Sequence, residues 1–122
     1  MKKIDVIVGI RPDFIRVAAL KTAFQDFEDT LDIRIIHTGQ HYDPELSQDI
    51  LEQLNLSSIH AYLDINVIEG IGKMASIMMS YENQIHIDRP DLVIVLGNSD
   101  SALACSLVAS RSHIEVAHIE AG

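Results

Sequence analysis

Short runs of aliphatic residues alternate with helical segments along the whole chain, and this alternation restricts the fold more than any other feature of the sequence. Five runs have the length of strands, and they cover residues 3–9, 31–39, 61–66, 91–97 and 114–120. The run DLVIVLG at residues 91–97 is the most continuous of them. Such a run is typical of a parallel strand buried on both faces, so we predict that it lies centrally in a sheet.

The segments between these runs carry apolar residues at helical spacing. Helices are therefore predicted at residues 11–27, 43–56, 69–89 and 99–112. Strands joined through helices by connections of a few residues run parallel, with right-handed crossovers. At 122 residues the chain has the length of one domain. The sequence thus predicts an α/β fold, in which one domain over residues 1–122 contains a doubly wound parallel sheet of about five strands.

Composition narrows the classes of partner. The net charge of −9 argues against a nucleic-acid backbone or an anionic membrane as the main partner, although backbone amides and one or two Arg could still hold a phosphate. No signal peptide and no apolar segment of membrane-spanning length is recognisable, so we expect a cytoplasmic protein. Cys105 is the only cysteine and lies in an apolar helical segment, which predicts a buried, inert thiol.

In open parallel sheets, ligands bind outside the carboxyl ends of the strands, near the point where the strand order reverses. Polar residues gather at these ends in this chain. The segments concerned are residues 9–12, 37–41, 97–101 and 118–122. Together they bring an Arg, three His, a Gln, an Asn, an Asp and a Glu to one edge, which we predict to be the functional site.

Known cofactor and metal motifs are missing from this predicted edge. The first turn reads GIRPDF and lacks the later glycines of G-x-G-x-x-G, and the chain contains no P-loop pattern, so we expect no nucleotide cofactor. His37 and His41 are four residues apart, but the turn containing Gly39 separates them. They are interpreted as polar loop residues, and no metal site is predicted. The other histidines, His60, His86 and His113, are expected at the surface or at helix caps.

Two features of the edge allow more than one interpretation. Asn98 or Ser99 could simply be a helix N-cap, with Asp100 favourably placed in the first turn. Alternatively, the amides at Ser99 and Asp100 could hold an anionic or hydroxylated ligand. Glu120 follows an apolar strand, and partial desolvation would raise its pKa and suit it to proton transfer. A salt bridge to Arg11 would lower that pKa instead.

Four segments together resemble the UDP-N-acetylglucosamine 2-epimerase family: GIRPDFIRVAAL, HTGQHYD, DLVIVLGNSDSALA and VAHIEAG. Their order and spacing fit over essentially the whole chain. The resemblance implies a Rossmann-like N-terminal domain that faces a second such domain, similar to the GT-B glycosyltransferases. The nucleotide sugar would lie in the cleft, and this chain would lack the C-terminal domain. The implied reaction inverts C2 of the sugar through elimination and re-addition of UDP, converting UDP-N-acetylglucosamine to UDP-N-acetylmannosamine without a cofactor.

The same resemblance assigns roles to residues of the first helix. Arg11 matches the Arg of the family's G-T-R-P-E motif, and Asp13 stands where Glu is usual. Arg16 matches a basic residue, commonly Lys, one helical turn later. Arg11 and Arg16 are therefore expected to stabilise charge on the diphosphate or to order the cleft, and Arg11 also to bind substrate.

Further roles fall on the later strand ends. Gln40 and His41 match the Q-H pair that binds substrate, and Glu120 matches the catalytic Glu of the E-A-G motif. Asn98 occupies the position of a catalytic Asp, and an amide cannot exchange a proton near neutral pH. Base chemistry at Asn98 is therefore expected to fail, with Asp100 as a possible substitute two residues on.

Three hypotheses remain open on the sequence. The leading one is the N-terminal part of an epimerase, inactive as an isolated chain. The second is a module that binds a nucleotide sugar without catalysis. The third is a domain kept for oligomerisation, in which part of the helix carrying Met74, Ile77, Met78 and Tyr81 forms a homodimer face rather than core. We expect UDP-N-acetylglucosamine or a related nucleotide sugar as ligand, and a homodimer.

Overall fold

The computed structural model describes residues 1–9, 11–27, 29–38, 59–63, 65 and 69–119. Strands and helices alternate through this part of the chain, as the sequence predicts. In chain order they are β1 (Lys2–Val8), α1 (Arg11–Ala23), a 3-10 helix (Gln25–Phe27), β2 (Leu31–His37), β3 (Ala61–Tyr62), α3 (Gly70–Ile87), β4 (Leu92–Leu96), α4 (Asp100–Arg111) and β5 (Glu115–Ile119). The helix predicted at residues 43–56 lies outside the described residues.

The largest differences between the predicted and the observed lengths concern two elements. The third strand was expected over residues 61–66, but β3 is confined to Ala61–Tyr62. The first helix was expected to reach residue 27, but α1 ends at Ala23 and a 3-10 turn follows. Such turns are frequent at helix ends, and Phe27 is 53% exposed, so burial of its side chain contributes little to stabilising a further α-helical turn there.

All strands of the sheet run parallel in the order β3-β2-β1-β4-β5. From β1 the chain builds outward through β2 to β3, then crosses to the other side of β1 with β4 and β5. The order therefore reverses between β1 and β4. As expected, β4 is an interior strand with buried side chains, although β1 occupies the middle of the sheet.

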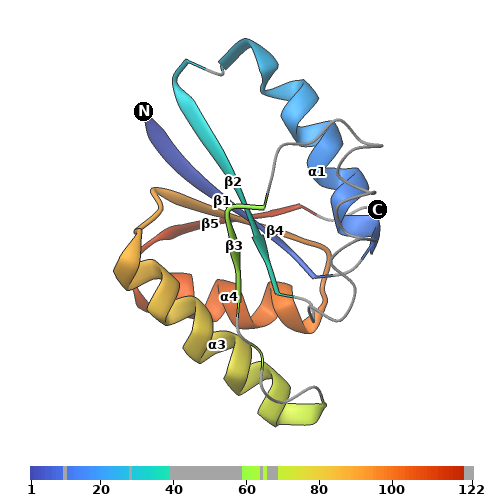
Figure 1. Cartoon of the computed structure of the whole chain (residues 1–122), viewed down its shortest axis with the longest axis vertical. Coiled ribbons are helices and arrows are strands. Elements are labelled where there is room, and N and C mark those ends of the chain that lie inside the picture. Colours follow the sequence, from blue (N-terminus) through green and yellow to red (C-terminus); the bar gives the residue numbers. More distant parts are fainter. Residues whose placement is uncertain (10, 28, 39–58, 64, 66–68, 120–122) are drawn as a thin grey trace.

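Helices cover both faces of the sheet (Figure 1). On one face, Phe14 and Val17 of α1 pack against alternate residues of β1, including Val6 and Val8. On the other face, α3 and α4 pack together over Ile7 and its neighbours. Period-two alternation along β1 thus supplies both cores, which gives the doubly wound arrangement that the sequence predicts.

The apolar stripe of α3, which the sequence left open between core and dimer face, packs in the core. Ile77 and Tyr81 are fully buried, and Met74 and Met78 pack against the same cluster. The stripe is therefore core rather than an exposed face. Cys105 is also fully buried in this cluster, and burial raises the pKa of its thiol, as expected for an inert cysteine.

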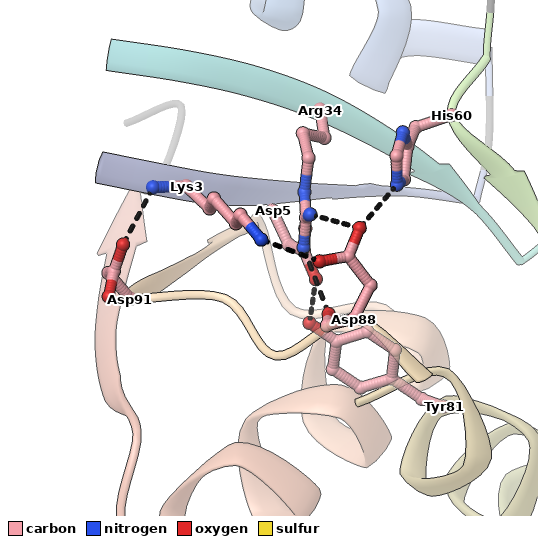
Figure 2. A network of polar contacts seen from close by, with 7 residues as sticks. All are labelled: Lys3, Asp5, Arg34, His60, Tyr81, Asp88 and Asp91. Atoms are coloured by element: carbon pink, nitrogen blue, oxygen red, sulfur yellow. Dashed lines mark hydrogen bonds and ion pairs between the residues drawn. The ribbon is translucent and has the colours of Figure 1, made fainter. Parts of the chain in front are cut away.

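A buried polar network crosses the α3 side of the sheet (Figure 2). The carboxylate of Asp5 on β1 accepts hydrogen bonds from Arg34 Nε at 2.8 Å and from the Tyr81 hydroxyl at 2.7 Å. Arg34 also contacts Asp88, which follows α3, through an ion pair of 2.5 Å and a 3.1 Å bond to its carbonyl oxygen. Lys3 and His60 contact Asp88 from the surface. The network therefore ties the end of α3 to β1 and β2.

Candidate functional site

The carboxyl ends of β1, β2, β4 and β5 lie at one edge of the sheet, because neighbouring strands are parallel and in register. The reversal of strand order between β1 and β4 falls at this edge. Gly9 follows β1 and Gly97 follows β4, so these two glycines flank the reversal point. In open α/β sheets this is the position at which ligands bind.

Gly9 is packed too closely for any side chain. A Cβ atom at Gly9 would lie 2.6 Å from Ser101 Oγ and 2.9 Å from Thr38 Oγ1. These two buried hydroxyls hydrogen-bond to one another, and Thr38 Oγ1 also donates to the Val8 carbonyl at 3.3 Å. The end of β2 and the first turn of α4 therefore meet directly behind the loop that follows β1.

Asp13 and Arg16 of α1 link the ends of β1 and β4. Asp13 is 1% exposed, and its Oδ2 accepts a 2.9 Å hydrogen bond from the Gly9 amide. Its other oxygen, Oδ1, lies 3.3 Å from Arg16 Nη1. The same Nη1 lies 3.0 Å from where a Cβ on Gly97 would stand, and Gly97 has a φ of +69°. The guanidinium of Arg16 is therefore placed against the backbone at the reversal point, with the side chain 30% exposed.

The ends of β4 and β5 are joined by a second set of contacts. The Gly97 amide donates to the Ile119 carbonyl at 2.8 Å, and His118 Nε2 hydrogen-bonds to the Gly97 carbonyl. The backbone of Gly97 is thus hydrogen-bonded to β5 through both its amide and its carbonyl, and Arg16 of α1 lies beside it. The sequence placed His118 at this edge but gave no reason for a contact with Gly97.

The start of α4 is capped as the first of the two interpretations expected. Ser99 is the N-cap, and its Oγ accepts a 3.3 Å hydrogen bond from the Ala102 amide. Asn98 is exposed. The Asp100 side chain is 55% exposed, and its Oδ2 lies 3.9 Å from Lys73 Nζ of α3. Asp100 thus pairs with a neighbouring helix. The binding of a ligand at Ser99 and Asp100 stays a prediction.

The histidines divide between core and surface. His37, interpreted from the sequence as a loop residue, is the last residue of β2 and is buried, which corrects that interpretation. Its ring stacks on Tyr62 and lies against Phe14, each with ring centroids 5.4 Å apart. His60, His86 and His113 lie at the surface as expected, and His60 Nε2 is 3.3 Å from Asp88 Oδ2.

Four of the predicted site residues, Arg11, Gln40, His41 and Glu120, add nothing to this described geometry. Gln40, His41 and Glu120 lie outside the described residues, and Arg11 is described only as the first residue of α1. Among the residues that are described, no group of three or more His, Cys, Asp or Glu side chains could hold a metal ion. No helix in that part of the chain is long and apolar enough to span a membrane.

The parallel sheet, its strand order and the polar edge at the reversal point define a Rossmann-like α/β domain. A model of the family described as UDP-N-acetylglucosamine 2-epimerase matches residues 25–122. The UDP-2,3-diacetamido-2,3-dideoxy-D-glucuronate 2-epimerase of Pseudomonas aeruginosa is 38% identical over 120 residues, which are 98% of this chain and 34% of that protein. The UDP-N-acetylglucosamine 2-epimerase of Methanocaldococcus jannaschii is 33% identical over 98% of this chain and 32% of its own length. The chain therefore belongs to the UDP-N-acetylglucosamine 2-epimerase family.

Solved structures agree with this assignment. The Methanocaldococcus jannaschii enzyme in complex with UDP-GlcNAc and UDP superposes with a TM-score of 0.85 at 33% identity, over 98% of this chain and 33% of that one. The Neisseria meningitidis enzyme bound to UDP-GlcNAc superposes with a TM-score of 0.84 at 28% identity, over all of this chain (100%) and 32% of the other. The chain thus spans about a third of the length of the relatives it matches.

Proposed function

We propose that this chain contributes one wall of the active site of a nucleotide-sugar 2-epimerase that converts UDP-N-acetylglucosamine to UDP-N-acetylmannosamine. UDP is eliminated, a proton is exchanged at C2, and UDP adds back. The observation that carries the proposal is the placement of Arg16 at the reversal point of the sheet, against Gly97 and paired with buried Asp13. A fixed cation at this edge is what a departing diphosphate requires. Relatives with this activity in their names support the choice of substrate.

Each predicted residue has a role in this proposal. Arg11 and Arg16 stabilise charge on the diphosphate, and Gln40 and His41 bind the substrate. Glu120 exchanges the proton at C2. The amides at Ser99 and Asp100 hold a phosphate or hydroxyl group at the start of α4. The second Rossmann-like domain of a GT-B-like arrangement supplies the opposite wall, so the isolated chain is expected to show no turnover.

Titration of UDP and of UDP-N-acetylglucosamine, followed by calorimetry, tests the binding role. The chain is measured alone and with a separately supplied C-terminal domain from a relative. Arg16→Gln is expected to weaken UDP binding by about tenfold or more, since hydrogen bonds to charged groups contribute about 1.5–3 kcal/mol. Arg111→Gln, which removes an exposed Arg at the far end of α4, is the matched control. Absence of UDP binding in both formats contradicts the proposal, and so does steady-state epimerisation by the isolated chain.

The residue at position 98 tests whether a proton-exchanging group at this strand end contributes to the rate. A carboxylate that exchanges protons contributes about 10²–10⁴-fold to a rate. Asn98→Asp in a two-domain version is therefore expected to raise turnover of UDP-N-acetylglucosamine by a similar factor. An unchanged rate would show that the proton transfers depend on other groups.

A second candidate function is binding without catalysis, which the amide at position 98 favours. A two-domain version that binds UDP-N-acetylglucosamine but shows no turnover, with or without Asn98→Asp, would identify this function.

We also propose a homodimer, formed through apolar side chains that α3 and α4 leave at the surface. Ile71 and Met79 of α3 are 81% and 70% exposed, and Leu103 and Leu107 of α4 are 52% and 44% exposed. A monomeric mass by light scattering would refute the dimer.

A further inference from the structure

Asp13 is buried at the functional edge, and both of its carboxylate oxygens have partners. Oδ2 accepts the hydrogen bond from the Gly9 amide at 2.9 Å, whereas Oδ1 faces Arg16 Nη1 at 3.3 Å. The two partners come from different parts of the edge, because Gly9 belongs to the loop after β1 and Arg16 lies one turn further along α1. A single buried carboxylate therefore fixes a loop and a cation relative to each other.

Arg16 depends on this contact for its position. An arginine side chain has many rotamers, and immobilising it costs conformational entropy. Arg16 is 30% exposed, so core packing alone does not restrict it, and its Nη1 has to fit against the backbone of Gly97. A carboxylate three residues earlier on the same helix is within reach of the guanidinium, and the 2% exposure of its side chain limits competition from water.

We propose that Asp13 is a positioning residue for Arg16: its carboxylate holds the guanidinium at the reversal point, in the place where it can meet the diphosphate of a nucleotide. The inference rests on the proposed function, because it presumes that Arg16 contacts the diphosphate. Asp13 itself touches no substrate in this arrangement and acts only through Arg16.

A simpler role for Asp13 makes a different prediction. An acidic residue in the first turn that reaches back to a preceding amide resembles a capping box, which stabilises the helix start and nothing else. That role uses Oδ2 and the Gly9 amide. An asparagine could keep that bond through its carbonyl oxygen, but it would remove the negative charge that faces Arg16. Asp13→Asn therefore separates the two roles.

The experiment uses the full chain with four variants: Asp13→Asn, Asp13→Glu, Arg16→Gln and the double variant Asp13→Asn/Arg16→Gln. Nuclear magnetic resonance follows the Gly9 amide and the exchange of the Arg16 guanidinium protons with water. We expect Asp13→Asn to leave the Gly9 amide hydrogen-bonded and to speed the Arg16 exchange severalfold. Asp13→Glu, which keeps the charge, should restore slow exchange at least in part. Unchanged Arg16 exchange in Asp13→Asn overturns the proposal.

UDP affinity supplies a second readout, arranged as a double-mutant cycle. Asp13→Asn is expected to raise the Kd for UDP about fivefold, and to have no further effect when Arg16 is already Gln. An equal loss in both backgrounds would mean that Asp13 acts on the fold and not through Arg16. If Asp13→Asn does not fold, the same cycle is run with Asp13→Glu, whose smaller change must also disappear in the Arg16→Gln background.

The two proposals can fail separately. If the wild-type chain does not bind UDP, either alone or with a supplied second domain, the proposed function is contradicted. The Arg16 exchange measurements still decide whether Asp13 positions the guanidinium, because they need no ligand. Binding that is lost in Arg16→Gln but unaffected in Asp13→Asn keeps the proposed function and rejects the positioning role.

Discussion

Asp5 is a charged residue in the otherwise apolar, buried part of β1, and its ion pair restricts how the strands of the sheet can pair. It lies in the middle of β1 with no exposed surface, and burial raises the pKa of its carboxyl, an effect that Tyr81 and Arg34 partly offset. The register places Arg34 of β2 directly beside Asp5, so the ion pair is a cross-strand neighbour contact. A buried pair of this kind restricts which strands and which register can form, because any other pairing leaves a charge without a partner.

Removing the Tyr81 hydroxyl tests the network at its most buried point. The Tyr81 side chain is fully buried, and its hydroxyl donates to Asp5 Oδ2 at 2.7 Å. Tyr81→Phe keeps the ring and removes one hydrogen bond to a charged acceptor, which should lower the free energy of unfolding by about 1.5–3 kcal/mol. Urea denaturation measures the change. A change below about 0.5 kcal/mol, the range of an ordinary surface substitution, would contradict this account.

Gly9 allows a second test at the scale of one atom. Gly9→Ala would bring a methyl group against the hydroxyls of Ser101 and Thr38, and overpacking of this kind costs about 1–3 kcal/mol of stability. Ser101→Ala removes the nearer of the two oxygens. Gly9→Ala should therefore cost less stability in the Ser101→Ala background than in the wild-type background. Thermal unfolding of the three variants checks this. Equal losses from Gly9→Ala in both backgrounds would mean that the hydroxyl contact does not limit the site.

At the scale of elements, the network controls where α3 ends and how it is anchored. Asp88 follows the last residue of α3, and its amide donates to the Gln84 carbonyl at 2.9 Å. Its carboxylate contacts Arg34, Lys3 and His60. Hydrogen bonds from Arg34 and Lys3 hold the pKa of the Asp88 carboxyl well below its ordinary value. The anchoring of α3 is therefore sensitive to acid.

The sign of this pH dependence follows from proton linkage. Because the pKa of Asp88 is lower in the folded chain, the unfolded chain binds more protons below about pH 3.9, and the stability that Asp88 contributes is lost as the pH falls. Asp88→Asn should therefore flatten the acid limb of the stability curve measured with urea. Asp5 has a raised pKa, so its contribution is lost as the pH rises above about 3.9, and Asp5→Asn should change the slope in the opposite sense. Equal slopes in the three proteins would contradict this account.

The elements themselves were predictable where local chemistry determines them. Apolar runs marked β1, β2, β4 and β5, and the N-cap at Ser99 was one of two interpretations that the sequence allowed. The short length of β3 and the end of α1 were not predictable, because tertiary contacts decide them. His37 was misassigned since a histidine beside a Gly-containing turn reads as polar, whereas here aromatic packing against Tyr62 and Phe14 buries it.

The candidate site was predictable in part. Parallel strand ends were enough to predict Asn98 and His118 at one edge, whereas Arg16 was predicted only from the resemblance to the family. The contacts between them were not, because the tie from Asp13 to Gly9 and the fit of Arg16 against Gly97 depend on distances that spacing does not encode. The Asp5 network was missed altogether. Its signal was the presence of Asp5 and Arg34 within runs that otherwise predict buried strands.

At the scale of the whole molecule, the strand order predicts a gradient of local stability. β1 has a neighbour on each side and lies between two helical layers, whereas β5 pairs only with β4 among the described residues and is largely exposed or half-buried. Amide hydrogen exchange should therefore be slowest in β1 and β4 and faster in β5. Mass spectrometry or nuclear magnetic resonance can measure the rates. Exchange in β5 as slow as in β1 would contradict the gradient and point to an edge covered by another chain.

The central place of β1 has a consequence during protein synthesis. β1 is synthesised before the other strands of this sheet, and it obtains its second neighbour only when the chain has been made as far as β4, which ends at Leu96. At about 5–20 residues per second this wait is on the order of ten seconds. An open strand edge can pair with other nascent chains, and an inward-pointing charge discourages such pairing. We expect Asp5 to protect the nascent chain in this way, so chains halted before Leu92 should aggregate more when they carry Asp5→Val.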